Sequence, residues 1–206
     1  MKSGWSIRPV SRLRGFWHRL WSSVRCGLLR AKGVQLGAGV RVLGLPVVAR
    51  ESRSTIAIGN NVVLTSALRM TALGVARPVI LRTLAAGAEI VVGDDTGMSG
   101  ATVCAIQSVR IGKRCLFGAD VLVADTDFHE VDEIPRRYLP LPASEGKDAV
   151  VIGDDVFLGA RSIVLKGVSI GNGSVIGAGS VVADDIPAGF VAAGNPARVI
   201  RALRHQ

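Results

Sequence analysis

Aliphatic residues recur at every sixth position through much of this 206-residue chain. The clearest run begins at Ile152 and reads IGDDVF, LGARSI, VLKGVS, IGNGSV, IGAGSV and VADDIP. An α-helix requires apolar residues about 3.6 apart, and a half-buried strand requires alternation, so neither fits as a long element. A spacing of six instead favours short strands joined by turns, in which each apolar side chain stacks on its equivalent one coil later.

Three runs of such positions together give about nineteen six-residue units. In the C-terminal run the leading residues are Ile152, Leu158, Val164, Ile170, Ile176 and Val182. The middle run uses Ile80, Ala86, Val92, Met98 and Cys104 and, after a one-residue slip at Arg110, Ile111, Phe117 and Val123. The weaker first run uses Leu36, Val42, Val48, Ile58 and Leu64. Glycine, asparagine and aspartate lie between these positions and tolerate tight turns. We therefore interpret Asp94-Asp95, Asp154-Asp155 and Asp184-Asp185 as turn formers and not as paired catalytic carboxylates.

This tandem of an aliphatic residue, a glycine and four further residues resembles the hexapeptide-repeat acyltransferases. The resemblance implies an all-β fold, a left-handed parallel β-helix with three repeats per coil and about six coils. The left hand comes from the resemblance alone, since general crossover rules favour the right hand. At a strand spacing of ~4.8 Å, six coils would make a prism roughly 30 Å long.

The repeat stops for about 27 residues between Val123 and Val151. Insertions of this size in a compact domain are uncommon and are usually functional. This one, at about 124–150, holds seven of the sixteen acidic residues and His129, the only histidine between the leader and His205. A solvated surface loop is the alternative interpretation. The residue content favours a catalytic loop.

The excursion and the residues after it resemble the sugar and polysaccharide O-acetyltransferases of the galactoside, maltose and colanic-acid type. In those enzymes a loop carries a catalytic histidine, an arginine pair follows, and the next coil opens much like IGDDVFLG at Ile152. The resemblance covers about residues 33–204 and implies that His129 is the general base and that Arg136 and Arg137 bind the acceptor.

The chemistry of His129 supports this role independently. Acyl transfer from a thioester to a sugar hydroxyl needs a base at neutral pH, and neutral imidazole is well matched to it. If residues 125–129 are extended, Asp125, Asp127 and His129 point to one face, so either acid can hold the imidazole in one tautomer. We assign Asp127 as the catalytic partner and Asp125 to acceptor binding. A metal site is the alternative for this pattern, but no second internal histidine completes a usual ligand set, so no metal is expected.

The resemblance also implies a co-substrate, acetyl-CoA, bound between the coils of neighbouring subunits of a homotrimer. The matching positions are Ala160 and Ala178 for backbone contacts to the pantetheine arm, and Arg198 and Arg201 for the adenosine phosphates. Many relatives carry a lysine where this chain has Asp184, so the phosphate clamp departs from the family pattern at this position.

Three further positions complete the expected site. Lys166 can compensate at the phosphate clamp, with a solvated lysine as the alternative. Phe157 occupies a position where relatives often have tryptophan beside the coenzyme arm, with core packing as the alternative. Ser99 is the nearest equivalent of a polar residue that contacts the acceptor.

The first 32 residues form a basic, Trp-rich leader with eight lysines and arginines and no acid, and the first carboxylate is Glu51. Apolar residues three and four apart predict one stripe of an amphipathic helix. The stripe contains Leu13, Phe16, Trp17, Leu20, Trp21, Val24 and Leu28. Cationic helices with tryptophan are typical of in-plane membrane binders. Docking on the prism or on a sister subunit is the alternative, and nucleic acid is not an expected partner.

We therefore expect a leader (1–32), a repeat domain (33–195) and a basic C-terminal helix (196–206) that begins at an Asn195 N-cap followed by Pro196. Three distant cysteines favour a reducing compartment. The expected function is O-acetylation of a saccharide in cell-envelope polysaccharide or lipid-linked glycan biosynthesis, on the cytoplasmic side of the membrane. The alternatives are another small acceptor (a xenobiotic hydroxyl or an amino-sugar amine) and a non-enzymatic, membrane-associated β-helical scaffold.

Overall fold

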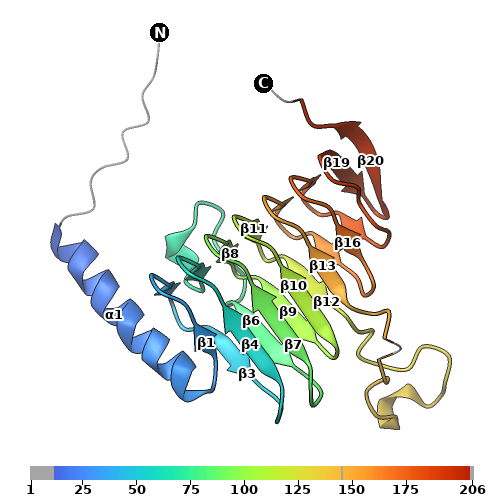
Figure 1. Cartoon of the computed structure of the whole chain (residues 1–206), viewed down its shortest axis with the longest axis horizontal. Helices are drawn as coiled ribbons and strands as arrows, with labels where there is room; N and C mark the ends of the chain where they lie inside the picture. Colours follow the sequence, from blue (N-terminus) through green and yellow to red (C-terminus); the bar gives the residue numbers. More distant parts are fainter. Residues whose placement is uncertain (1–11, 145, 205–206) are drawn as a thin grey trace.

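The chain winds through three parallel sheets in turn, so that each coil contributes one strand to each sheet (Figure 1). The computed structural model describes residues 12–144 and 146–204, with side chains from Leu20 onward. The expected parallel β-helix is confirmed, with six coils that each place one strand in all three sheets.

The strands are short, and most contain two to four residues. The first sheet contains β1 (Gln35–Leu36), β4 (Thr55–Ile58), β7 (Glu89–Val92), β10 (Ser108–Ile111), β13 (Val150–Ile152) and β16 (Ser169–Ile170). The second contains β2 (Arg41–Leu43), β5 (Val63–Thr65), β8 (Gly97–Ser99), β11 (Leu116–Ala119), β14 (Phe157–Leu158), β17 (Val175–Ile176), β19 (Phe190–Gly194) and β20 (Ala197–Ala202). The third contains β3 (Val47–Ala49), β6 (Ile80–Thr83), β9 (Thr102–Ala105), β12 (Leu122–Ala124), β15 (Ile163–Val164) and β18 (Val181–Val182). We call the turns after the first, second and third sheets the first, second and third corners.

Inward side chains stack from coil to coil and form the core. The first ladder is Leu36, Ile58, Val92, Ile111, Ile152 and Ile170. The second is Val42, Leu64, Met98, Phe117, Leu158 and Ile176. The third is Val48, Leu81, Val103, Val123, Val164 and Val182. The stacking inferred from the spacing of six is thus the packing that the fold uses.

The predicted register is wrong at three positions of the middle run. Leu81 and Val103 occupy the third ladder in place of Ile80 and Cys104, and Ala86 is in no ladder. An excursion at residues 66–79, which the repeat pattern did not reveal, precedes β6. This excursion, and the corners of unequal length that follow it, break the spacing of six. A repeat register extended across them is therefore displaced by one residue.

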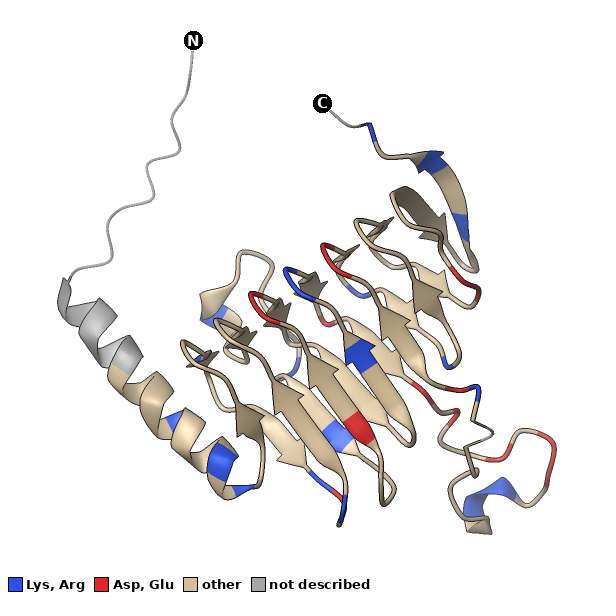
Figure 2. Ribbon diagram, in the orientation of Figure 1, with Lys and Arg blue, Asp and Glu red and all other residues tan. Residues whose placement is uncertain are grey.

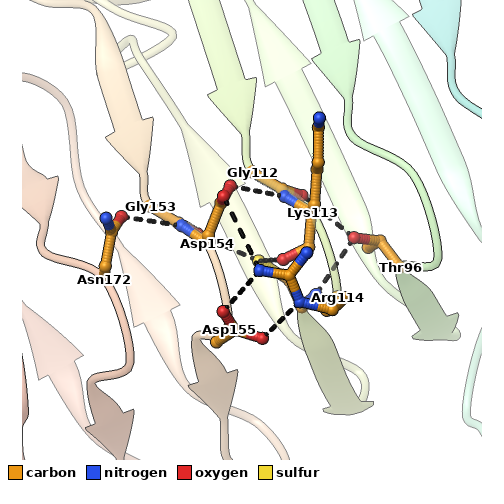
Figure 3. Close-up of polar contacts among 9 residues, drawn as sticks. Thr96, Gly112, Lys113, Arg114, Gly153, Asp154, Asp155 and Asn172 are labelled. Carbon is orange, nitrogen blue, oxygen red and sulfur yellow. Dashed lines mark hydrogen bonds and ion pairs between the residues drawn. The ribbon is translucent and has the colours of Figure 1, made fainter.

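Aspartate and asparagine side chains hold the first corners together (Figure 3). The Asp154 carboxylate accepts a hydrogen bond from the Lys113 amide of the preceding coil (2.8 Å), and the Asn172 side chain accepts one from the Asp154 amide (2.9 Å). Asp94 accepts the equivalent bond from the Asn60 amide (2.7 Å). The interpretation as turn formers is confirmed for Asp94-Asp95 and Asp154-Asp155.

Helix α1 (Arg12–Ala31) closes the N-terminal end of the coil stack (Figure 1). The first coil has no predecessor to pair with, and buried backbone groups need partners. Side chains of α1 supply them: Ser22 Oγ accepts from the Val42 amide (2.8 Å), and Arg25 Nη1 donates to the Val42 carbonyl (3.2 Å). Cys26 and Leu29 of the same face are buried in the core.

The expected C-terminal helix is wrong, because the segment after Pro196 forms strand β20, antiparallel to β19. The β-branched residues Val199 and Ile200 favour a strand. Beyond the last coils, β19 also offers an open edge whose backbone groups β20 pairs. Tertiary pairing therefore overrides the local helix-start signal at Asn195.

Candidate active site

The long excursion runs from the end of β12 to the start of β13, at a third corner, and stands away from the coil stack (Figure 1). Its first residue, Asp125, is buried, and its carboxylate accepts hydrogen bonds from the amides of Ile106 (2.6 Å), Gln107 (2.8 Å) and Ser108 (2.7 Å). Burial raises the pKa of the Asp125 carboxyl, and the three backbone donors oppose that rise. Asp125 therefore ties the start of the excursion to the third corner of the preceding coil.

Gln107, in that same preceding corner, also holds the end of the excursion. Its side-chain amide donates to the carbonyl of Gly146 (2.9 Å), and its side-chain oxygen accepts from the hydroxyl of Ser144 (2.6 Å). Sequence reasoning missed Gln107 and Ser144. The available signal was position: Gln107 lies in the third corner one coil before the excursion.

Lys166 lies in the third corner one coil after the excursion. Its ammonium is 2.7 Å from Oδ2 of Asp127 and 3.8 Å from Oδ1 of Asp148, so it joins the two ends of the excursion. Asp148 is buried and its carbonyl accepts from the Gly167 amide (2.7 Å). Lys166 therefore lies with the excursion, on a different corner from the expected coenzyme positions Ala160 and Ala178.

His129 is exposed and lines a cavity of about 530 Å³ inside the excursion. The charged and polar residues around it are Asp127, Glu130, Asp132, Ser144, Asp148 and Lys166. Three sequence-predicted residues, His129, Asp127 and Lys166, are thus brought to one site. A neutral imidazole in this position can accept a proton from a hydroxyl bound in the cavity.

The arrangement of Asp125, Asp127 and His129 differs from the extended one predicted. The strand ends at Ala124, and Phe128 adopts a left-handed backbone conformation (φ 62°), so the three side chains do not share a face. Asp125 points to backbone amides, and Asp127 pairs with Lys166. Within the described residues no hydrogen bond or ion pair joins either acid to His129.

Arg136 and Arg137 lie at the outer end of the excursion in the 3₁₀ turn η2 (Arg136–Tyr138). The Arg136 guanidinium donates to the carbonyl of Val131 through Nε (3.1 Å) and Nη2 (2.6 Å), and thereby fixes the loop's own backbone. The Arg137 guanidinium lies 5.8 Å from the ring centre of Tyr138. Neither arginine lines the His129 cavity.

A second candidate site is a groove of about 660 Å³ along the second corners. Ala119, Ala160 and Ala178 of successive coils lie along it, and Leu68 and Leu73 of the 66–79 excursion cover it. The coils approach closely here: a Cβ on Gly159 would lie 2.5 Å from the Ala178 nitrogen. The amides of Ala160 and Ala178 donate no hydrogen bond to any described residue.

Ser99 and Phe157 both belong to the second sheet. Ser99 is half-buried at the end of β8, and its carbonyl accepts from the Asp120 amide beside the groove (3.0 Å). Phe157 is 43% exposed on the outer face of β14, next to Leu116, so core packing is wrong for this side chain. Neither residue lies at the corner that carries His129.

Arg198 and Arg201 lie on β20, at the C-terminal end of the stack. The Arg198 guanidinium is 2.6 Å from the carboxylate of Asp184, the residue that stands where relatives often have lysine. Arg201 donates to the carbonyl of Ala202 (3.0 Å). Arg198, which is predicted to contact the coenzyme phosphates, is therefore already paired with Asp184. Among the described residues, no group of three or more His, Cys, Asp and Glu side chains is placed to hold a metal ion.

Comparison with known proteins matches the repeats to a family model described as the hexapeptide repeat of succinyl-transferase, over residues 108–123 and 149–183. A curated 2,3,4,5-tetrahydropyridine-2,6-dicarboxylate N-acetyltransferase from Clostridium perfringens is 53% identical over 57 residues. That match covers 28% of this chain and only 24% of the relative.

Two solved structures share the fold over most of the chain. One is a galactoside acetyltransferase in complex with coenzyme A, 27% identical with a TM-score of 0.53, covering 82% of this chain and 65% of the other. Another is AntD, an N-acyltransferase from Bacillus cereus, 18% identical with a TM-score of 0.64, covering 87% and 89%. The chain thus has the repeat and the left-handed parallel β-helix of the hexapeptide-repeat acetyltransferases, as its sequence predicted.

Proposed function

We propose that the chain transfers an acetyl group from acetyl-CoA to a hydroxyl of a saccharide, with His129 as general base. The observation that carries the proposal is the built excursion. Its two ends are fastened to the preceding coil through Asp125 and Gln107 and to the following coil through Lys166, and it holds His129 in a polar cavity. A scaffold has no evident need for a histidine held in this way.

The reaction is a direct attack on the thioester. An imidazole nitrogen of His129 accepts the hydroxyl proton as the hydroxyl oxygen bonds to the thioester carbonyl carbon. The C–S bond breaks, and the proton passes from the imidazolium to the departing sulfur. A backbone amide of a coil stabilises the charge that develops on the carbonyl oxygen.

The groove along the second corners suits the pantetheine arm of the co-substrate. Its floor of alanines leaves room for a chain, and the amides of Ala160 and Ala178 can donate to the arm's carbonyl groups. Arg161 also lines the groove and supplies a positive charge. The similarity to a galactoside acetyltransferase bound to coenzyme A supports the same co-substrate here.

The groove and His129 lie at different corners of one prism, at opposite ends of the third-sheet strands. A single chain therefore does not bring its own groove to its own histidine. An assembly in which the excursion of one protomer faces the groove of the next brings His129 of one chain to the groove of another. This geometry supports a homotrimer with active sites between subunits. Light scattering on the full chain tests this: a monomer that retains full activity would contradict it.

An amine acceptor is the second candidate. The observation that favours it is the match of the repeats to N-acetyltransferases in the curated relatives. His129 as base and acetyl-CoA as donor would serve both reactions. The cavity around His129 would determine whether a hydroxyl or an amine is acetylated. A xenobiotic hydroxyl is a further candidate acceptor, and it would react in the same way as the saccharide hydroxyl.

The test is release of the coenzyme A thiol from acetyl-CoA with a panel of saccharides, amino sugars and xenobiotic alcohols. His129→Ala should lower kcat by about 10²–10⁴-fold. His18→Ala, the same change in the leader, is the matched control and should keep the wild-type rate. Equal rates for His129→Ala and the wild type would overturn the mechanism, and turnover of amines alone would overturn the hydroxyl acceptor.

A further inference from the structure

Helix α1 has two opposite faces, and both contain apolar residues. The inward face carries Ser22, Cys26 and Leu29, which are buried against the first coil. At 100° per residue, the other large apolar side chains of the helix lie on the opposite side. These are Leu20, Trp21, Val24 and Leu28, with exposed fractions of 46%, 54%, 49% and 52%. We call these four residues the outer ridge.

The outer ridge is the described part of the apolar stripe predicted from the sequence. The side chains of Leu13, Phe16 and Trp17, which continue that stripe, lie outside the described residues. Docking of α1 on the prism uses the Ser22, Cys26 and Leu29 face and leaves the ridge uncovered by any described residue. Closing the end of the stack therefore does not explain why the ridge is apolar.

The segment of sequence that carries the ridge is basic. Between residues 20 and 50 the chain has five basic residues and no acid. These are Arg25, Arg30, Lys32, Arg41 and Arg50. In Figure 2 the described part of α1 shows basic positions and none that are acidic. An apolar ridge on a basic, acid-free segment complements a surface that is apolar inside and negative outside.

We propose that the outer ridge binds an anionic lipid bilayer, with α1 lying in the plane of the headgroups. No described helix is long and apolar enough to cross a membrane. The proposed contact uses only the exposed side of α1. The ridge side chains enter the boundary between headgroups and acyl chains, and each basic residue near the surface adds about 1 kcal/mol with acidic lipids. A second copy of α1 is the poorer partner, because it brings a like positive charge to the same contact.

Membrane binding of this kind does not depend on the proposed activity. If both hold, the chain works at a membrane surface, where lipid-linked saccharide acceptors are present. The two proposals fail separately, since one is read from lipid binding and the other from release of the coenzyme A thiol.

The experiment uses the full chain and vesicles of phosphatidylcholine, with or without phosphatidylglycerol. All three tryptophans lie in the first 32 residues, so tryptophan emission reports on the leader alone. We expect the protein to float with the phosphatidylglycerol vesicles, its emission to shift to the blue, and added salt to weaken binding, since salt screens exposed charges. Trp21→Ser/Leu28→Ser should lower the vesicle partition coefficient by at least about tenfold.

Leu45→Ser is the matched control, because Leu45 is a leucine at least as exposed (64%, against 52% for Leu28) in the first coil but outside α1. It should float like the wild type. Circular dichroism and thermal unfolding verify that both variants are folded. Flotation of Trp21→Ser/Leu28→Ser at the wild-type level, or equal binding to both kinds of vesicle, would overturn the proposal. The proposal would also be overturned if the wild type failed to float and the mass of its assembly fell in the Trp21→Ser/Leu28→Ser variant. That result would show that the outer ridge contacts a second copy of the chain.

Discussion

Asp127 and Lys166 form an ion pair across the base of the excursion, with 2.7 Å between Oδ2 and Nζ. The two residues come from different coils and both line the cavity that contains His129. Their side chains are 37% and 40% exposed. Water screens such a pair, so it contributes to the placement of the loop more than to the stability of the fold.

A double-mutant cycle tests this positioning role. Asp127→Asn and Lys166→Gln should each lower kcat/KM, and the double variant should lose no more than the larger single loss. Exposed pairs couple by about 0.2–1 kcal/mol, which corresponds to about 1.5- to 5-fold. High salt should lower the wild-type value toward that of the variants. Additive losses would show that the two residues act independently.

Removal of the Asp125 charge should destabilise the root of the excursion. In Asp125→Asn an amide N–H₂ must face at least one of the backbone donors at Ile106, Gln107 and Ser108. A buried donor left unsatisfied costs about 1–3 kcal/mol. Urea unfolding measures the loss. Asp127→Asn, an exposed aspartate two residues later, is the control and should change stability by less than about 0.5 kcal/mol. Equal stabilities for the two variants would contradict the assigned role.

The repeat made most of this fold predictable, because a spacing of six leaves few ways to bury every aliphatic position. The ladders through Ile152, Leu158 and Val164 follow directly from it. The register at Leu81 was not predictable, because the 66–79 excursion has no residue pattern of its own. β20 was missed because the strand edge that it covers is a property of the assembled sheet and not of local sequence.

The site was predictable in content and less so in geometry. An interruption rich in acids and containing one histidine pointed to His129 and Asp127, which share a cavity. Lys166 lines the same cavity, although the sequence assigned it to the coenzyme phosphates. The tie between Asp125 and three backbone amides was missed because those amides lie 17 to 19 residues earlier in the chain, in the preceding coil. Gln107 was missed because its partner lies 39 residues away in the chain.

The Arg114–Asp155 pair at a first corner predicts a pH dependence of stability. Hydrogen bonds from Arg114 (2.7 Å to each carboxylate oxygen) lower the pKa of Asp155 (Figure 3). The folded state therefore binds this proton less readily than the unfolded state. The stabilisation is present above the unfolded pKa of about 3.9 and is lost as the pH falls through the lower folded pKa.

Asp155→Asn should consequently lower the Tm at neutral pH and leave it close to the wild-type value in strong acid. The difference is expected to be small, because both side chains are about half-exposed (52% and 51%). Thermal unfolding from neutral to acid pH measures it. Arg114→Gln should give the same profile. A Tm difference that stays constant over this range would exclude the ion pair as its cause.

Two substitutions in α1 should change stability in opposite directions. Ser22→Ala removes the acceptor of the buried Val42 amide and should cost about 1–3 kcal/mol. A Cβ added at Gly27 meets no atom within 4 Å, so Gly27→Ala should stabilise the helix by up to about 1 kcal/mol. Urea unfolding of both variants measures the two effects. Unchanged stability in Ser22→Ala would mean that α1 does not close the first coil through this bond.

If the proposed co-substrate places its phosphates at Arg198, Asp184 should weaken their binding, because the Asp184 carboxylate already pairs with the Arg198 guanidinium (2.6 Å). Asp184→Asn frees the guanidinium for a phosphate, to which arginine binds strongly. We expect the KM for acetyl-CoA to fall several-fold, with kcat unchanged. Arg198→Ala should raise the KM for acetyl-CoA. The double variant Asp184→Asn/Arg198→Ala should have the same KM as Arg198→Ala alone, because without Arg198 the Asp184 carboxylate no longer competes with the phosphates for the guanidinium. A fall in KM that persists without Arg198 would show that Asp184 acts by general repulsion of the phosphates and not through this pair.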